Sequence, residues 1–429
     1  MRVNVRFSEV NTKIDVDFAE NHSRINADFG TVTVIKEPEP EKPTTIGTVV
    51  DDSISVFKQV PVNSVGHCYI SKLGGYTHEV ADDSTILAPI RIENAKPTAI
   101  KVHGANLIKF PYSFTSEITR SGVKFTVNAD RGISAIGTPT GIFTYSYVRS
   151  LSLPAGTYTY SASGIDKLVS VLSIQRRDTG TFIRNKGNIK GSTPSLTFTI
   201  TEEEAKIADV FINFYSGSGA MDETFYPMIN RGSAAIPYTD YKEPVEITLP
   251  DSLTSLANLG LGLYDNEYNE LDLVNLKYYS RCSTKTLVGT ETFSYSKLGS
   301  RSRFNITAPT NARYWQGNTL SRMKCDYLNC DVTVNAINGN DALKNKIQHW
   351  QTGWFLYVDG TDFPDLATWQ AYLAEHNMEV VYELEQESVT DINLGGFNPL
   401  IEVEGGGSIE FVTDSGFAPN STVIYQTIE

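Results

Sequence analysis

Residues 143–162 read FTYSYVRSLSLPAGTYTYSA, and this stretch decides the fold. Two runs of strand-forming residues stand on either side of Pro154-Ala-Gly156, which is a turn signal. Further short runs of the same kind occur at 123–127, 168–174, 196–200 and 210–215. Short strands with turns at regular spacing predict an antiparallel β-sandwich, so we expect the chain to be mainly β.

The chain has 429 residues and a formal net charge of −14. Its length is too great for one ordinary core and predicts about three folded units. The excess of negative charge argues against a nucleic-acid partner, because such binding depends on neutralising phosphates with Lys and Arg. No apolar run approaches the ~20 residues of a membrane span, and the polar start at Met1–Val10 does not resemble a secretory signal. We therefore expect no nucleic-acid binding and no membrane insertion.

The first segment of the chain repeats itself. Phe7, Phe18 and Phe29 recur at one spacing within alternating runs, which predicts a meander of three short strands over residues 1–35. Three strands of this size barely form a core on their own. We therefore expect this segment to attach to other proteins or to form an oligomer, most simply a homotrimer.

The rest of the chain is expected to divide into five parts. The Pro- and Glu-rich stretch Lys36–Pro43 predicts a semi-rigid linker over residues 36–48. The four parts that follow are a small β unit at 49–98, a jelly-roll-like β-sandwich at 99–243, a second β-sandwich-like domain at 244–392 and a C-terminal β segment at 393–429. The expected fold class is therefore a set of tandem antiparallel β-sandwiches.

Two helical signals interrupt the β pattern. A proline opens a helical pattern near residues 364–377, in which Leu366, Trp369 and Leu373 recur on one face. The stretch Thr201–Glu204 has the spacing of a capping box, which predicts a single helical turn. We expect only the first of these to be a full, although short, helix.

Motifs of enzyme active sites are missing from the sequence. There is no GxSxG nucleophile elbow, no phosphate-binding loop ending in Gly-Lys-Ser/Thr and no HExxH helix. Cys325 and Cys330 have no second pair at matched spacing, so we expect free thiols and not a zinc site. His67, Cys68 and His78 stand beside Gly-rich turns and are expected in loops. The sequence predicts no enzyme, metal or cofactor, although it gives no distance between two catalytic carboxylates.

Aromatic side chains are the remaining candidates for a binding site, because flat rings stack on the apolar faces of sugars. Trp315 lies in a polar loop with Tyr314, Arg313 and Gln316, whose polar groups suit sugar hydroxyls. We expect these four residues to form a carbohydrate-binding site, with a core position for Trp315 as the alternative.

A second set of aromatic residues alternates in the strands of the opening stretch, at Tyr145, Tyr147, Tyr158 and Tyr160. Most aromatic side chains of β-sandwiches are buried. We therefore expect these four to pack in the core or across strands, with a sugar-stacking surface as the alternative.

Seven short motifs occur in one order along the chain. They are Leu73-Gly-Gly-Tyr-Thr77, Val102-His-Gly-Ala-Asn-Leu107, Leu153-Pro-Ala-Gly-Thr-Tyr158, Phe225-Tyr-Pro-Met-Ile-Asn230, Ile236-Pro-Tyr238, Val380-Val-Tyr-Glu-Leu384 and Val403-Glu-Gly-Gly-Gly407. In this set and order the chain resembles tail-fibre or baseplate-type structural proteins of phages and prophages of gut bacteria. The middle motifs also resemble those of carbohydrate-binding-module-like jelly-roll domains, in which they are signatures of the fold.

The resemblance implies a non-enzymatic virion protein that binds host cell-surface polysaccharide during adsorption. It implies a location in the phage particle after synthesis in the host cytoplasm, with other virion proteins bound through the N-terminal segment. One alternative is a head fibre, collar or spacer protein with no ligand. Another is a glycan-cleaving fibre enzyme, although the long β-helix repeats usual in such enzymes are missing from the sequence.

Overall fold

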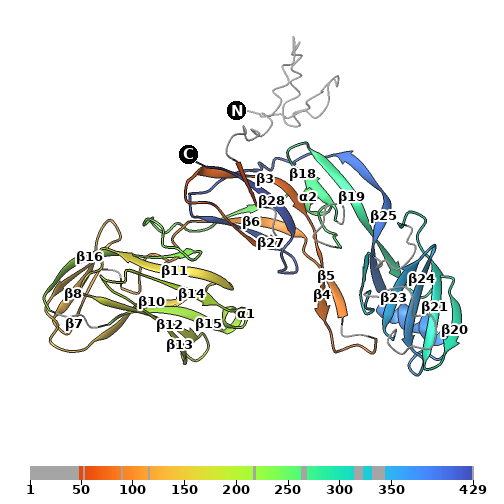
Figure 1. The fold of residues 1–429 in the computed structure, drawn as a ribbon, viewed down its shortest axis with the longest axis horizontal. Helices are drawn as coiled ribbons and strands as arrows, with labels where there is room; N and C mark the ends of the chain where they lie inside the picture. The colour runs from red at the N-terminus through yellow and green to blue at the C-terminus, as the bar shows by residue number, and fades with distance from the viewer. Residues whose placement is uncertain are drawn as a thin grey trace, which may run out of the picture. The chain divides into compact units, whose positions relative to one another are not determined.

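The structure is a computed structural model, and it describes residues 48–51, 54–87, 90–114, 116–215, 219–261, 268–313, 322–330 and 344–427. These residues are mainly β, with antiparallel sheets and three short helices, which confirms the expected fold class (Figure 1). The chain divides into residues 1–41 and residues 42–429. The meander expected at 1–35 and nearly all of the expected linker lie outside the described residues.

The region expected as the first sandwich contains two antiparallel sheets. The four-stranded sheet has the order β10 (Thr144–Leu151), β15 (Ala208–Tyr215), β12 (Val169–Arg176) and β13 (Phe182–Ile189). The six-stranded sheet has the order β14 (Ser195–Ile200), β11 (Gly156–Ser163), β16 (Met221–Arg231), β9 (Ile133–Gly137), β8 (Val123–Val127) and β7 (Glu117–Arg120). Successive side chains of a strand point to opposite faces, so each sheet turns one set of side chains into a shared core.

Aromatic rings fill the core of this sandwich. Phe214 stacks on both Phe125 and Tyr147, with ring centroids 4.3 Å apart in each pair. Phe225 meets Phe214 edge-on. Offset stacks and edge-on contacts are the arrangements that aromatic pairs prefer. The alternating aromatic residues of the sequence therefore form a continuous buried layer.

Helix α1 (Glu202–Ile207) begins at the expected capping box. The Thr201 hydroxyl accepts a hydrogen bond from the Glu204 backbone N–H at 3.2 Å, and the Glu204 carboxylate accepts one from the Thr201 N–H at 3.0 Å. Each bond satisfies a donor that has no partner within the helix. The prediction is confirmed, although the helix has six residues and extends beyond one turn.

Segments from distant parts of the chain share one long sheet. It contains β1 (Thr48–Asp51), β28 (Asn420–Thr427), β3 (Ser64–Gly74), β18 (Glu270–Asp272), β19 (Lys277–Leu287), β25 (Met378–Asp391) and β22 (Met323–Cys325), and β26 (Leu400–Glu402) also pairs with β3. Thr48 lies opposite Gln426 in the β1–β28 pair. Residues 49–98 and 393–429, which we expected as separate parts, therefore pair with each other.

A second sheet packs its apolar side chains into the same core as part of the long sheet. It has the order β17 (Val245–Thr248), β6 (Pro97–His103), β27 (Ser408–Thr413) and β2 (Phe57–Gln59). Helix α2 (Asp251–Thr254) follows β17 and buries Leu253. A separate hairpin is formed by β4 (Thr77–Ala81) and β5 (Ile90–Asn94).

The last sheet has the order β20 (Ser294–Leu298), β21 (Arg301–Thr307), β24 (Gly353–Asp359) and β23 (Lys346–Trp350). Helix α3 (Leu366–His376) buries Trp369 and Leu373, as its sequence pattern predicts. Trp369 stacks on Phe304 of β21 with ring centroids 4.9 Å apart. The helix expected near 364–377 is confirmed, and its N-cap is Asp365, which accepts a hydrogen bond from the Thr368 N–H at 2.9 Å.

Candidate functional site

Arg313 is the one residue of the predicted carbohydrate site that lies within the described part of the chain. Its backbone N–H donates to the Glu383 carbonyl of β25 at 2.9 Å, and its guanidinium forms an ion pair with the Glu383 carboxylate. Arg313 is therefore held against β25 through both backbone and side chain. Tyr314, Trp315 and Gln316 lie outside the described residues, so the site built on them stays a prediction.

A cavity of about 390 Å³ lies next to the segment that leads to Arg313. Its lining combines apolar and polar side chains from Lys285, Glu291, Thr292, Ile306, Thr307, Ala308, Pro309, Thr310 and Trp354. Trp354 is fully buried and lies 5.5 Å from Tyr382, measured between ring centroids. This tryptophan belongs to the core and offers no exposed ring for stacking.

The four alternating tyrosines do not form an exposed surface. Tyr147, Tyr158 and Tyr160 are buried, and Tyr145 packs partly against the same core. The Tyr147 and Tyr160 hydroxyls bond each other, and Tyr160 also contacts the Ser170 hydroxyl at 2.7 Å. Burial raises the pKa of Tyr160 to about 12. The expectation of core packing is confirmed for these residues.

In the sheet formed by β10, β15, β12 and β13, the face that points away from the core carries a different set of side chains. On β15, Val210, Ile212 and Phe214 point into the core and are buried. Because side chains alternate along a strand, Phe211 and Asn213 point to the opposite face, where both are partly exposed.

We call five residues of this surface the amide face: Ser146, Ser173, Gln175, Phe211 and Asn213. Ser146 Oγ donates a hydrogen bond to Asn213 Oδ1, and Gln175 Nε2 donates to Ser173 Oγ at 3.2 Å. Ser173 lies opposite Phe211 in the β12–β15 pair. The amide face therefore places uncharged donors and acceptors beside a phenyl ring, with Ser173 itself buried. This combination suits sugar hydroxyls and the apolar face of a sugar ring.

Two exposed aromatic side chains border the amide face. Tyr215 is 41% exposed and lies opposite Val169 of β12, and Phe182 is 57% exposed and lies opposite Gln175. Exposed rings gathered on one surface are typical of binding sites. This surface was not predicted from the sequence, and the pattern that indicates it is the alternation of Phe211, Asn213 and Tyr215 along one strand.

An ion pair between a buried carboxylate and an exposed arginine fixes the strand beside the amide face. The Asp209 carboxylate accepts hydrogen bonds from the hydroxyls of Ser150 and Ser152 and pairs with Arg177 Nε at 2.9 Å. Burial acts to raise the pKa of Asp209, but these three groups outweigh it and hold the pKa below its usual value. The carboxylate therefore stays ionised and serves to anchor the strand ends.

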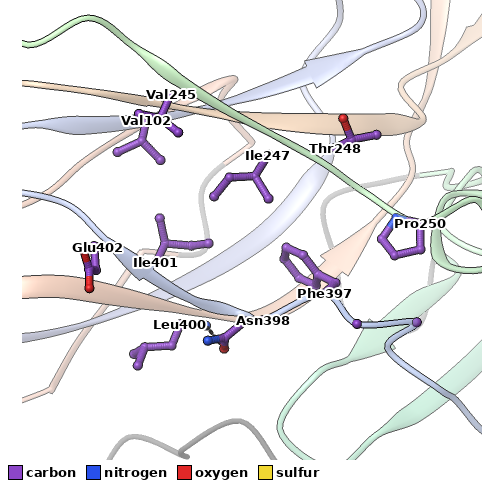
Figure 2. Close-up of a pocket in the computed structure, with 12 residues that line it drawn as sticks. Val102, Val245, Ile247, Thr248, Pro250, Phe397, Asn398, Leu400, Ile401 and Glu402 are labelled. Atoms are coloured by element: carbon purple, nitrogen blue, oxygen red, sulfur yellow. Dashed lines mark hydrogen bonds between the residues drawn. The ribbon is translucent and has the colours of Figure 1, made fainter. Parts of the chain in front are cut away.

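A groove of about 640 Å³ lies between β17 and the chain segment that contains β26 (Figure 2). Figure 2 shows Ile247 and Ile401 pointing into it from opposite sides, with Phe397 nearby. The Asn398 side chain accepts a hydrogen bond from the Leu400 N–H at 3.0 Å and shapes the local turn. The groove is mainly apolar, so its chemistry suits an apolar group better than a sugar.

His67, Cys68 and His78 lie in strands, so the expectation that they lie in loops is wrong. His67 and Cys68 continue the eleven-residue strand β3, and His78 lies in β4. Burial raises the pKa of the Cys68 thiol to about 12. All four cysteines are buried, and none forms a disulfide. Among the described residues, no group of three or more His, Cys, Asp or Glu side chains is arranged to hold a metal ion.

Among the helices that the structure describes, none has the length and apolar character needed to span a membrane. No protein-family model matches the chain, and no curated protein matches it in sequence. A solved structure of a protein from Parabacteroides distasonis, inferred to be secreted, aligns with 87% of this chain and 100% of its own. That alignment has 8% sequence identity and a TM-score of 0.19, which is too low to inform either the fold or the function.

Proposed function

We propose that the chain is a structural, non-enzymatic subunit of a tailed-phage particle, a fibre or baseplate component that binds a glycan on the host surface. The observation that carries the binding part is the amide face, where neutral amides and hydroxyls lie beside a phenyl ring. The ordered set of seven motifs supports the assignment to a phage particle, because the resemblance extends over most of the chain.

The motif residues support a structural role, because two of their glycines stand where no side chain fits. A Cβ atom on Gly75 would lie 2.3 Å from the backbone carbon of Asn258, and one on Gly405 would lie 2.2 Å from the Val62 carbonyl oxygen. Both distances are below any real contact of a Cβ atom. These glycines therefore allow close backbone approach at the junctions of the sheets.

The alternatives differ from this proposal in what happens at the amide face. A head fibre, collar or spacer protein would have the same buried aromatic core and no ligand. A glycan-cleaving enzyme would need two carboxyl groups about 5–10 Å apart beside the sugar. Asp209, the carboxylate next to the amide face, is already held by Arg177 and two serines. This arrangement favours binding over cleavage at this surface.

A glycan array tests the proposal directly. We expect the wild-type chain to bind one class of surface glycan, and Asn213→Ala and Phe211→Ala to weaken that binding. The loss of one hydrogen bond to the sugar corresponds to about threefold to tenfold in the dissociation constant. Gln370→Ala on α3 is the matched control, because α3 packs into a different core from this sheet. Unchanged binding by both amide-face variants would move the site elsewhere, and an absence of binding would favour the spacer.

Localisation on purified particles tests the structural part. We expect gold-labelled antibody against the chain to mark the tail fibre or baseplate, in about three copies for each fibre if residues 1–35 form a homotrimer. Labelling of the head or collar would support the alternative without a ligand. Failure to find the chain in purified particles would contradict the proposal.

A further inference from the structure

The groove of Figure 2 is bordered on one side by β17, which is an edge strand. β17 ends the order of its sheet, and β6 is its only partner among the described strands. At the end of this pair, the Leu249 N–H donates to the Thr98 carbonyl at 2.9 Å. Successive residues of an antiparallel strand point their backbone groups alternately toward and away from the partner strand. The backbone groups of Glu246 and Thr248 therefore point away from β6, toward the free edge.

The strand on the other side of the groove, β26, has a free edge as well. Its one partner in the described part of the chain is β3. The Val403 N–H donates to the Gly66 carbonyl at 2.9 Å, and the Pro399 carbonyl accepts from the Ile70 N–H at 3.0 Å. By the same alternation, the backbone groups of Glu402 point away from β3. The groove thus lies between two strands that are each paired on one side.

Apolar side chains form the floor of the groove. Phe397 and Ile401 belong to the core that the two sheets share, and Ile247 packs partly against that core. Val245 points to the same side of β17 as Ile247, because they are two residues apart, and it is 61% exposed. A free strand edge beside uncovered apolar side chains is the kind of surface to which another chain adds a β-strand.

The charge around the groove is negative. Glu402 is the one ionisable residue of its lining, and this side chain is exposed. Glu246 lies on the outward side of β17 and remains half exposed, although it forms an ion pair with Lys101 at 3.3 Å. An added strand with apolar side chains toward the floor and cations toward the outside would match both the shape and the charge of this edge.

A segment with this pattern stands at the start of the sequence, outside the described residues. In Arg2-Val-Asn-Val-Arg-Phe7, apolar residues alternate with polar ones, and the polar ones include two arginines and no acidic residue. The similar runs that end at Phe18 and Phe29 contain aspartates. The first run is therefore the one whose charge is complementary to the groove, in a chain whose net charge is −14.

We propose that the groove binds the Arg2–Phe7 segment of a second copy of this chain, as a β-strand added along the free edge of β17. The three apolar side chains of the segment cover the floor of the groove, and one of its arginines lies beside Glu246 on the outer face. This contact is head-to-tail, so it closes a ring, such as the expected homotrimer, or continues as a filament. The inference adds an assembly surface and does not depend on glycan binding.

Disulfide cross-linking between two full-length chains of different size tests the inference. One chain carries Arg2→Cys or Arg6→Cys, which represent two registers of the added strand, and the larger, tagged chain carries Glu246→Cys. The four native cysteines are buried, so the new thiols are the accessible ones. After mixing and mild oxidation, we expect a mixed pair on a non-reducing gel in at least one register. Its yield should exceed the control by about tenfold or more, because binding raises the effective concentration of the two thiols.

Glu117→Cys in the tagged chain is the matched control. Glu117 also lies on a four-residue edge strand, β7, and also pairs with a lysine, Lys124, at 2.6 Å. Its strand belongs to a different sheet from β17. A mixed pair formed equally well with Glu117→Cys would come from random collision and would overturn the inference.

Sedimentation velocity of the full chain gives a second readout that needs no new thiol. Val5→Asp should weaken self-association about tenfold or more, because it places a charge against the apolar floor of the groove. Ser8→Asp adds the same charge just beyond the segment and should leave self-association unchanged. Equal association of the wild type and Val5→Asp would contradict the inference.

The remaining outcomes separate the second copy from other occupants. No mixed pair above the control level in either register would overturn the inference. A link that forms only within single chains carrying both new cysteines would mean that each chain binds its own segment, and it would overturn the role of a second copy. None of these results bears on the glycan array, so the proposed function stands or falls separately.

Discussion

Asp326 is a partly buried carboxyl group whose ionised form destabilises the folded chain. Burial raises its pKa to about 6, and the negative charge of Glu379 adds to the effect. The Asp326 Oδ1 atom is buried without a hydrogen-bond partner. At neutral pH the folded chain therefore holds an ionised carboxylate in a place that favours the neutral acid.

Asp326→Asn should raise the free energy of unfolding at pH 7, by about 1–2 kcal/mol once solvent screening is allowed for. The folded pKa lies above the ordinary value of 3.8, so the wild type loses stability as the pH rises from about 4 to 6. At pH 3.5 the carboxyl is mostly protonated in both states, and the variant should gain little. Urea unfolding at pH 7 and at pH 3.5 measures the two cases; an equal gain at both values would contradict this account.

The buried hydroxyl of Tyr160 should contribute to stability in a pH-dependent way. Tyr160→Phe removes its bonds to Tyr147 and Ser170, which should cost about 1 kcal/mol at pH 8. The folded pKa of Tyr160 is about 12 against an ordinary value of 10, so its ionisation favours the unfolded chain above pH 10. The variant should therefore lose less stability than the wild type between pH 10 and 12, by up to about 1.4 kcal/mol for each pH unit.

Chemical denaturation of both proteins across this pH range measures the difference. Tyr145→Phe is the control, because Tyr145 is only partly buried against the core. Parallel stability curves for the wild type and Tyr160→Phe above pH 10 would argue against a buried, neutral Tyr160.

At the scale of elements, short sequence patterns predicted the two helices that depend on interactions between residues close in sequence. The helix α3 followed from the spacing of Leu366, Trp369 and Leu373, and α1 followed from the capping box. The strand β13 (Phe182–Ile189) was missed, because its sequence has no alternation and the strand depends on pairing with β12. Tertiary contacts override weak local propensity in such strands.

The amide face shows the same limit. Alternation along β15 places Phe211 and Asn213 on one face, which a sequence can reveal. It cannot reveal that β10 and β12 are the neighbours that bring Ser146 and Gln175 beside them. Likewise, only the register between β21 and β24 sets Asp359 opposite Arg301.

The glycine turn after β3 gives a prediction at this scale. Gly75→Ala should destabilise the fold by about 2–3 kcal/mol, because the added methyl group would meet the backbone of Asn258 and Leu259. Gly141→Ala is the matched control, since no atom lies within 4 Å of its added Cβ, and it should change stability by less than about 0.5 kcal/mol. Thermal melting compares the two; equal melting temperatures would mean that the turn relaxes freely.

At the scale of the whole chain, the two ends of the sequence contribute differently to the fold. The last strand, β28, pairs with both β1 and β3, and its residues Val423 and Tyr425 are buried in the core. Residues 1–41 belong to a different part of the chain. Length alone therefore does not decide which deletion the fold tolerates.

Deletion of residues 1–41 should leave a cooperative thermal transition, whereas deletion of residues 420–429 should abolish it. The shorter deletion removes the strand between β1 and β3 and exposes the apolar core beneath it. Circular dichroism melting of the two truncated chains measures this. Cooperative melting after loss of residues 420–429 would contradict the pairing described for β28.

The central claim is that the chain binds glycan on the surface of a bacterial host. Adsorption of the labelled, purified chain to a panel of gut-bacterial strains, before and after periodate oxidation of their surface glycans, tests it most directly. We expect adsorption to at least one strain, loss of that adsorption after oxidation, and about threefold to tenfold weaker adsorption of Asn213→Ala. Adsorption that survives oxidation, or none to any strain whose phages carry this chain, would contradict the claim.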